Sequence, residues 1–370
     1  MKIGIDFHSA EREGSGNCTY IRNLVEALLQ IDQENQYLLY VTNISHPYYK
    51  QYKDIKNVRL RPTISNHPFI RMPILGLNTI IDQIDLLHVQ YAAPPIHKGK
   101  LVLTIHDICF IHFPECFGKL ERCYLKTLVP VNILRASKIL TGSQFSLNDI
   151  IKKYRASANK IRVIYDAVKP TLKPLQVGEE EKQILKGYGI SDKFIFFLGR
   201  INARKNTSLL VKAFIMLKQE EKIPHQLVIA GKEDFLPQNI LRNIQVSKAR
   251  KDIIFTGYLR EDYLPIFFNS AEVFVYPSIY EGFGLPCLEA MAYGCPVVSS
   301  NVSSIPEIVK DAGLLVSNLN AGELATAIMK IIANPALKEE LKNKGLQRAQ
   351  LFTWEKTAKE TLNIYKEVVK

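Results

Sequence analysis

The sequence predicts an α/β protein made of two doubly wound, Rossmann-like domains. Its 370 residues exceed the ~100–200 residues of one ordinary domain. Short apolar runs alternate with helical patterns along the whole chain, which is typical of parallel strands joined by crossover helices. A Pro-containing stretch without periodicity, Val168–Val177, separates two such series. We therefore predict an N-terminal domain over 1–170, a C-terminal domain over 171–352, and a last helix over 353–370 that packs back towards the first domain.

The first series begins with a strand and a helix whose apolar residues share one face, from Tyr20 to Ile31. The strands expected in this half are Lys2–Asp6, Tyr37–Val41, Leu86–Val89, Leu101–Ile105 and Ile139–Thr141, followed by the apolar stretch Ile161–Ile164. The second series repeats the pattern. Its expected strands are Phe194–Leu198, Gln226–Ala230, Ile253–Thr256, Val273–Tyr276, Pro296–Ser299 and Gly313–Val316, with helices over Ser208–Lys218, Leu285–Ala292 and Thr353–Val369.

Composition excludes several classes of protein. With 47% hydrophobic and 23% charged residues, the chain is neither disordered nor fibrous. It has no uncharged apolar run of transmembrane length, and the apolar stretch near its N-terminus is too short for a signal peptide. We therefore expect a cytoplasmic location with six reduced cysteines. The spacing of Cys109, Cys116 and Cys123 invites a metal site, but no CxxC pair is present and Pro114 interrupts the segment, so no metal is expected.

The formal net charge of +12 favours an anionic partner. Nucleic acid is disfavoured because the chain has no RNP-type strand, zinc-finger spacing or repeat array. Residues 50–75 form a basic stretch, with aromatic and apolar residues interleaved. The basic residues are Lys50, Lys53, Lys56, Arg59, Arg61 and Arg71, opposed only by Asp54. This stretch is interpreted as a contact for an anionic membrane surface, or else as a solvated basic loop.

The most informative motif follows the strand that ends at Tyr276 and reads PSIYEGFGLPCLEAMAYGCPV. Gly282 and Gly284 flank Phe283 and allow backbone amides to approach a ligand, while Leu285 and Pro286 suit the first turn of a helix. Such a turn presents N–H groups to an anion, as in a phosphate cradle.

Two carboxylates in this motif, Glu281 and Glu289, are separated by seven residues. Eight helical steps of ~1.5 Å span ~12 Å, which is wider than the ~5–9.5 Å of a glycosidase pair. The spacing suits hydroxyls at opposite ends of an elongated ligand. The alternative is two ordinary solvated glutamates.

Further candidates follow other strands, where open α/β sheets bind ligands. The turn after the first strand of the second domain carries Arg200, Arg204 and Lys205, which suit phosphate oxygens or form an exposed basic turn; Arg204 is expected to be solvated. His106 and Asp107 end a first-domain strand. A lone histidine is more often structural, and Asp107 is expected to fix local structure.

The chain resembles the two-domain GT-B glycosyltransferases of family 4, whose signature is the Glu–seven residues–Glu element just quoted. The match runs from GIDFHSA near the start to FTWEKTAKETLNIYKEV at the end. The resemblance implies that Glu281 contacts donor-sugar hydroxyls and Glu289 the nucleotide ribose. It places Arg200 and Lys205 on the diphosphate and His106 near the reacting carbon, as a sugar contact and electrostatic stabiliser. The domains of this family face a central cleft.

The resemblance extends to four further positions. Gly14 and Gly16 are implied in diphosphate binding, and Gly231 and Tyr258 lie in the region that shelters the nucleobase, although Tyr258 equally suits a core position. Two departures stand out: GSGNCTY lacks an arginine that relatives carry, and Asp166-Ala167 replaces their Asn-Gly.

The implied activity is sugar transfer from a nucleotide donor to a glycan or lipid-linked saccharide, with retention of anomeric configuration. The donor is a co-substrate, and neither a cofactor nor a metal is implied. Similarity to bacterial O-antigen mannosyltransferases ranks GDP-mannose first, ahead of UDP- or dTDP-sugars. Alternatives of other classes are an NAD-dependent oxidoreductase, whose glycine fingerprint is incomplete here, and a catalytically silent nucleotide-sugar-binding subunit.

Overall fold

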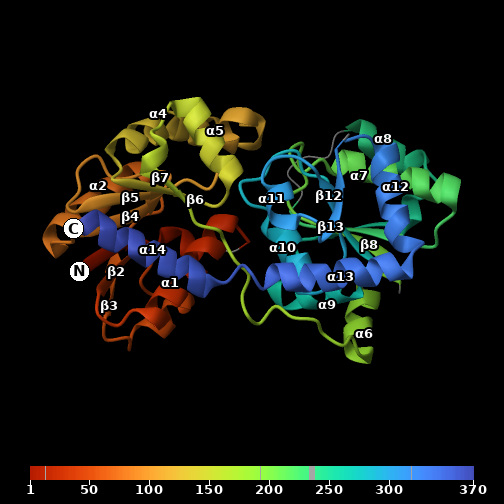
Figure 1. Ribbon diagram of the computed structural model, residues 1–370, viewed down its shortest axis with the longest axis horizontal. Coiled ribbons are helices and arrows are strands. Elements are labelled where there is room, and N and C mark those ends of the chain that lie inside the picture. The colour runs from red at the N-terminus through yellow and green to blue at the C-terminus, as the bar shows by residue number, and fades with distance from the viewer. Residues whose placement is uncertain (13, 192, 233–237, 318) are drawn as a thin grey trace. The chain divides into compact units, whose positions relative to one another are not determined.

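The computed structural model describes residues 1–12, 14–191, 193–232, 238–317 and 319–370. The chain forms two compact units: Met1–Ala167 together with Thr353–Lys370, and Val168–Phe352 (Figure 1). The first unit thus ends at Ala167, where the sequence suggested residue 170. Each unit is a parallel sheet with crossover helices, which confirms the predicted fold class.

The first unit contains a seven-stranded sheet in the order β3-β2-β1-β4-β5-β6-β7. Its strands are β1 (Lys2–Asp6), β2 (Gln36–Val41), β3 (Val58–Pro62), β4 (Leu86–Gln90), β5 (Lys100–Thr104), β6 (Lys138–Thr141) and β7 (Ile161–Val163). Its helices are α1 (Gly16–Ile31), α2 (Pro68–Asp82), α3 (Cys109–His112), α4 (Lys119–Arg135), α5 (Gln144–Tyr154) and α14 (Trp354–Val369). The last helix, α14, packs along α1 (Figure 1).

The second unit contains a six-stranded sheet in the order β10-β9-β8-β11-β12-β13. Its strands are β8 (Phe194–Leu198), β9 (Gln226–Ala230), β10 (Ile253–Gly257), β11 (Val273–Tyr276), β12 (Val297–Ser300) and β13 (Gly313–Val316). Its helices are α6 (Glu179–Gly187), α7 (Thr207–Met216), α8 (Gln238–Val246), α9 (Leu264–Ser270), α10 (Leu285–Ala292), α11 (Ile305–Val309), α12 (Ala321–Ile332) and α13 (Pro335–Ala349). The buried strands are rich in Phe, Val and Ile, as expected where helices cover both faces of a sheet.

Three predicted helices have different bounds in the structure, and one of them, α14, differs only in beginning at Trp354 rather than Thr353. Helix α1 begins at Gly16 rather than Tyr20, because the Ser15 hydroxyl accepts a hydrogen bond from the amide of Cys18 at 3.3 Å and caps the first turn. Helix α7 ends at Met216, and the chain continues as a π-helical turn over Leu217–Glu221.

Strand β3 was not predicted from the sequence, because its residues fall in the basic stretch that carries no clear strand pattern. Its arginines obscure the apolar alternation, and only Val58 among its side chains is buried. The strand lies at the edge of the sheet and pairs in parallel with β2. Charged residues and a final proline are typical of edge strands.

The same stretch contains a second correction. Arg71 is 5% exposed and pairs with the buried carboxylate of Asp6 at the end of β1. A carboxylate in the interior requires a cationic or hydrogen-bonding partner, so Arg71 is part of the interior and not of a surface patch. The tyrosines Tyr49 and Tyr52 are also buried. Lys50, Lys53, Lys56 and Arg59 are exposed as expected.

Each sheet has a switch point, where the connections reverse direction. It lies between β1 and β4 in the first sheet and between β8 and β11 in the second. Open α/β sheets bind ligands at the carboxyl ends of the strands beside such points. Within the described residues, no helix is both long enough and apolar enough to cross a bilayer.

Candidate active site

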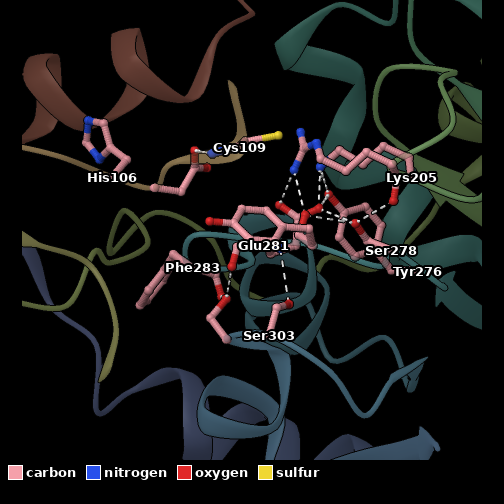
Figure 2. Close-up of polar contacts among 12 residues, drawn as sticks. His106, Cys109, Lys205, Tyr276, Ser278, Glu281, Phe283 and Ser303 are labelled. Atoms are coloured by element: carbon pink, nitrogen blue, oxygen red, sulfur yellow. Dashed lines mark hydrogen bonds and ion pairs between the residues drawn. The ribbon is translucent and has the colours of Figure 1, made fainter. Parts of the chain in front are cut away.

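In the second unit, polar side chains gather at the carboxyl ends of the two strands that flank the switch point. Lys205 lies in the turn between β8 and α7, and Tyr276 is the last residue of β11. Ser278 and Glu281 follow in the loop between β11 and α10. Figure 2 shows that these side chains converge on the carboxylate of Glu281.

Glu281 is buried, with four side chains around its carboxylate. Lys205 Nζ lies 2.6 Å from Oε1, which also accepts hydrogen bonds from the hydroxyls of Ser278 at 2.5 Å and Tyr276 at 3.0 Å. Arg204 Nη1 lies 3.2 Å from Oε2. Lys205 also donates to the hydroxyl of Tyr276 and lies over its ring.

Opposing effects act on the ionisation of Glu281. Burial alone favours the neutral acid, but Lys205 and Arg204, with the hydrogen bonds, outweigh it and lower the pKa to about 2. The carboxylate is therefore ionised at any physiological pH. Burial and the neighbouring Glu281 raise the pKa of Tyr276 well above its ordinary value, so its hydroxyl remains a donor.

Serines of the next strand and loop hold the Glu281 loop in place. The single hydroxyl hydrogen of Ser304 is shared between the carbonyls of Glu281 and Phe283, which lie 2.9 and 2.8 Å from Oγ. Glu281 N donates to Ser303 Oγ at 3.1 Å. Ser300 Oγ donates to the carbonyl of Ser278. These serines were not predicted from the sequence, although the serine-rich run Ser299–Ser304 at the end of an expected strand could have indicated them.

The turn between this loop and α10 requires glycine at one position. Gly284 has φ of +107°, and a Cβ there would lie 2.8 Å from Ile305 Cδ1. Its carbonyl accepts the amide hydrogen of Cys287 in the first turn of the helix. The helix α10 has the bounds that the sequence predicted, with Leu285 first and Pro286 second.

Glu289, the second carboxylate of the motif, lies on α10 and is half-buried. Burial, with a smaller contribution from the charge of Glu261, raises its pKa to about 7. The two glutamates thus have opposite electrostatic surroundings. Neighbouring cations lower the pKa of Glu281, whereas burial and the charge of Glu261 raise the pKa of Glu289.

The basic turn after β8 differs from the sequence interpretation. Arg204 was expected to be solvated, which is wrong: its side chain is 17% exposed, and Nη1 donates to the carbonyl of Tyr280 at 2.8 Å besides pairing with Glu281. The buried carboxylate of Glu281 thus has Arg204 as a second cationic partner besides Lys205. Arg200 is exposed at the end of β8.

Two glycines bring the ends of β8 and β9 together. Gly231 has φ of +140°, and a Cβ there would lie 2.0 Å from the carbonyl oxygen of Gly199. This close approach of two backbones leaves no room for a side chain. Tyr258, after β10, is 58% exposed and so is not a core residue.

In the first unit, His106 follows β5 at the carboxyl edge of the sheet. Its Nε2 lies 2.8 Å from Gln90 Oε1, and Gln90 Nε2 donates to Ser9 Oγ at 2.8 Å. The rings of Tyr20 and Tyr91 contact the imidazole at centroid distances of 4.6 and 5.8 Å. Burial lowers the pKa of His106 to about 4, so the side chain is neutral at physiological pH. A positively charged His106 is therefore not supported.

Other first-unit candidates lie near this edge. Gly14, with φ of +73°, and Gly16 flank the helix cap at the start of α1. Asp107 Oδ1 accepts the amide hydrogen of Cys109 at 2.9 Å, which confirms its structural role. Asp166 is buried, burial raises its pKa to about 7, and its Oδ1 has no hydrogen-bond partner among the described residues.

This combination of two Rossmann-like units with a Glu-x7-Glu loop defines a class of sugar-transferring enzymes, and comparisons with known proteins agree. The model for glycosyl transferases group 1 matches residues 180–348, and the model for glycosyltransferase family 4 matches residues 15–172. The O-antigen chain mannosyltransferase B of Escherichia coli is 32% identical over 277 residues, covering 74% of this chain and 71% of the relative. The chain belongs to the family 4 glycosyltransferases.

Other similar proteins are more distant or longer. The serotype-specific mannosyltransferase WbdA of Escherichia coli is 31% identical over 70% of this chain, which spans only 32% of that protein. Among solved structures, sucrose-phosphate synthase from Thermosynechococcus elongatus aligns with TM-score 0.78 and 21% identity, covering 100% of this chain and 99% of that one. Anabaena HepE in complex with UDP and glucose aligns with TM-score 0.75 and 17% identity, covering 99% and 100%.

These structural matches establish the GT-B fold of the chain, and the family membership makes it a glycosyltransferase. The nicotinamide-dependent oxidoreductase and the silent binding subunit, which the sequence left open, therefore lose their support.

Proposed function

We propose that this glycosyltransferase transfers a mannosyl residue from GDP-mannose to a glycan or lipid-linked saccharide of a cell-surface polysaccharide. The support for mannose is that several similar proteins are named as mannosyltransferases, among them the O-antigen enzyme of Escherichia coli and a mannosyltransferase of Mycolicibacterium hassiacum that is 28% identical over 63% of this chain. UDP- and dTDP-sugars are the alternative donors.

The observation that carries the mechanism is the ion-paired cluster around Glu281. An ionised carboxylate accepts hydrogen bonds from sugar hydroxyls, which suits Glu281 to the donor sugar. The positive charges of Lys205 and Arg200 stabilise the negative charge that grows on a departing nucleoside diphosphate. Glu289 is assigned to the ribose hydroxyls, and Gly14 and Gly16 to the diphosphate.

In the proposed reaction, an acceptor hydroxyl attacks the anomeric carbon of the donor on the face that the diphosphate leaves. The new bond joins the acceptor oxygen to this carbon, while the bond from the carbon to the diphosphate oxygen breaks and leaves its electron pair on the phosphate. The departing phosphate takes the proton of the acceptor hydroxyl. Because the new bond forms on the face that the diphosphate leaves, the anomeric configuration is retained. Because protein cations supply the positive field, no metal ion is required by this mechanism.

The test is release of nucleoside diphosphate from GDP-mannose, UDP-glucose and dTDP-rhamnose, each with and without a lipid-linked saccharide and with and without EDTA. We expect GDP release from GDP-mannose alone, dependent on the acceptor and unaffected by EDTA. Glu281→Ala provides the control for background hydrolysis. Turnover only with another donor, or complete loss in EDTA that Mg²⁺ restores, contradicts the corresponding part of the proposal. NMR of the product's anomeric carbon tests retention.

We further propose that the first unit attaches to an anionic membrane surface, where lipid-linked saccharides reside. The exposed cations Lys50, Lys53, Lys56 and Arg59 support this, since each basic residue near such a surface contributes ~1 kcal/mol. The outer face of α2 adds apolar side chains, with Phe69 74% and Ile81 68% exposed. Exposed apolar residues beside cations are typical of surfaces that contact lipid.

Vesicle co-sedimentation tests the attachment. We expect binding to vesicles with anionic lipid, loss of binding at high salt, and weaker binding of the triple variant in which Lys50, Lys53 and Lys56 are each changed to Glu. The matched control changes three exposed lysines of the second unit, Lys193, Lys212 and Lys222. Equal binding to neutral and anionic vesicles, or equal loss in both variants, contradicts the proposal.

A further inference from the structure

Gln90 occupies a special place in the first sheet, as the last residue of β4 beside the switch point. It is 8% exposed and links two neighbours. One is Ser9, which lies just beyond β1; the other is His106, which lies just beyond β5. The amide therefore bridges groups at the carboxyl ends of three adjacent strands.

In the orientation that the structure gives this amide, its oxygen faces the imidazole. Gln90 Nε2 donates to Ser9 Oγ at 2.8 Å, which leaves Oε1 facing His106 Nε2 at 2.8 Å. A carbonyl oxygen can only accept, so Nε2 of His106 carries the hydrogen. In a neutral imidazole the other nitrogen, Nδ1, is then an acceptor.

The remaining surroundings of His106 fix the ring without occupying Nδ1. Tyr20 meets the ring edge-on at 4.6 Å and 80°, and Tyr91 lies at 5.8 Å and 58°. No described residue forms a hydrogen bond with Nδ1. The other buried histidine of this sheet, His88, contrasts with it, because Tyr365 and Thr104 occupy both of its nitrogens at 2.5 and 2.7 Å.

We infer that Gln90 is a positioning residue for sugar transfer: it holds His106 as the Nε2–H tautomer, so that Nδ1 accepts a hydrogen bond from a hydroxyl of the bound sugar. This inference rests on the proposed function for its substrate. The tautomer itself follows from the first unit alone. A protonated imidazole would donate from both nitrogens and could accept from none, so this role requires the neutral ring.

The experiment is NMR of the full chain with ¹⁵N-labelled histidine side chains, with the His106 signals assigned by their loss in His106→Gln. We expect the wild type to show a protonated Nε2 and an unprotonated Nδ1 from pH 5.5 to 8. Gln90→Leu removes the acceptor and should give a mixture of tautomers. Gln90→Glu keeps an acceptor oxygen and should restore the Nε2–H form at pH 8, where the imidazole is neutral even though the new carboxylate raises its pKa.

Turnover should fall in the variants that lose the Nε2–H tautomer of His106. We expect kcat to fall roughly tenfold in Gln90→Leu, the scale of one hydrogen bond, and to recover in part in Gln90→Glu. If Gln90→Leu does not fold, Ser9→Ala serves instead, because it frees the amide to rotate. An Nδ1–H tautomer in the wild type, or unchanged tautomer and turnover in the variants, overturns the inference. Absence of mannosyl transfer by a wild type with the Nε2–H tautomer would instead count against the proposed function.

Discussion

The surroundings of Glu281 in the second unit and of His106 in the first differ in charge. Glu281 is ionised and contacts the cations Lys205 and Arg204. His106 is neutral and contacts an amide and two aromatic rings. Both side chains follow strands at the carboxyl edge of a parallel sheet, so the fold alone does not produce the difference.

The difference indicates a division of labour between the two units. In the proposed function, cations of the second unit stabilise a departing diphosphate, and a buried carboxylate holds one of them, Lys205, in place. The neutral imidazole of the first unit suits hydroxyl groups, which are uncharged. Four predictions test this contrast, beginning with the largest expected effect.

Replacing Lys205 with Ala should lower turnover ~10²-fold or more, because it removes a cation from the leaving diphosphate and a partner from Glu281. Steady-state kinetics with the best donor measures the loss, and a thermal melt verifies folding. Lys193→Ala, at an exposed lysine of the same unit, is the matched control. Near-normal turnover of Lys205→Ala would show that Lys205 does not contribute to sugar transfer.

The two arginines after β8 should separate into different roles. Arg204→Ala should destabilise the second unit by about 1–3 kcal/mol, because it removes a partner of a buried carboxylate. Arg200→Ala, at an exposed residue, should leave stability almost unchanged while lowering turnover. Thermal melts measure the loss of stability in each variant, and steady-state kinetics measures the loss of turnover. Equal melting temperatures would show that Glu281 does not depend on Arg204.

Nucleotide binding should depend on pH through Glu289. Its pKa of about 7 means that it is largely protonated at pH 6 and ionised at pH 8, and the ionised form accepts two ribose hydrogens better. GDP affinity of the wild type should therefore rise several-fold relative to Glu289→Gln between these pH values. Calorimetric titration of both proteins measures the difference and cancels the titration of the phosphate itself. A constant ratio of affinities would contradict the ribose assignment.

The last prediction concerns the stability of the first unit, at Asp166. Its pKa is raised from 3.8 to about 7, so between these values the folded state holds a proton that the unfolded state has lost, and stability falls as pH rises. Relative to the wild type, the free energy of unfolding of Asp166→Asn should rise by about 1–3 kcal/mol between pH 4.5 and pH 8. Fluorescence of Trp354, the single tryptophan, reports unfolding of the first unit. A gain independent of pH would show that the carboxyl is not titrating.

Much of the fold was predictable because it depends on local patterns. Apolar runs between helical segments located the strands of both sheets except β3, whose arginines hide its alternation, and β7, which the sequence indicated only as an apolar stretch. The glycines before α10 and the proline in its first turn placed its first residue correctly. The spacing in the same loop also singled out Glu281 and Glu289 as candidate ligand contacts.

The contacts of the site were not predictable, since they join residues far apart in the sequence. Lys205 and Glu281 are separated by 76 positions, and Gln90 and Ser9 by 81. No local pattern distinguishes Arg204, which turns inward, from Arg200, which is exposed. The same holds for Arg71, which pairs with Asp6 across the interior of the first unit.

The sequence by itself therefore determined the class of fold, the order of its elements and the residue types at the ends of the strands, because periodicity and turn residues act over short distances. Only the tertiary structure decided which charges are paired, which are exposed and which nitrogen of His106 carries the hydrogen. Burial and hydrogen bonding determine these properties, and both arise only when strands distant in sequence become neighbours in a sheet.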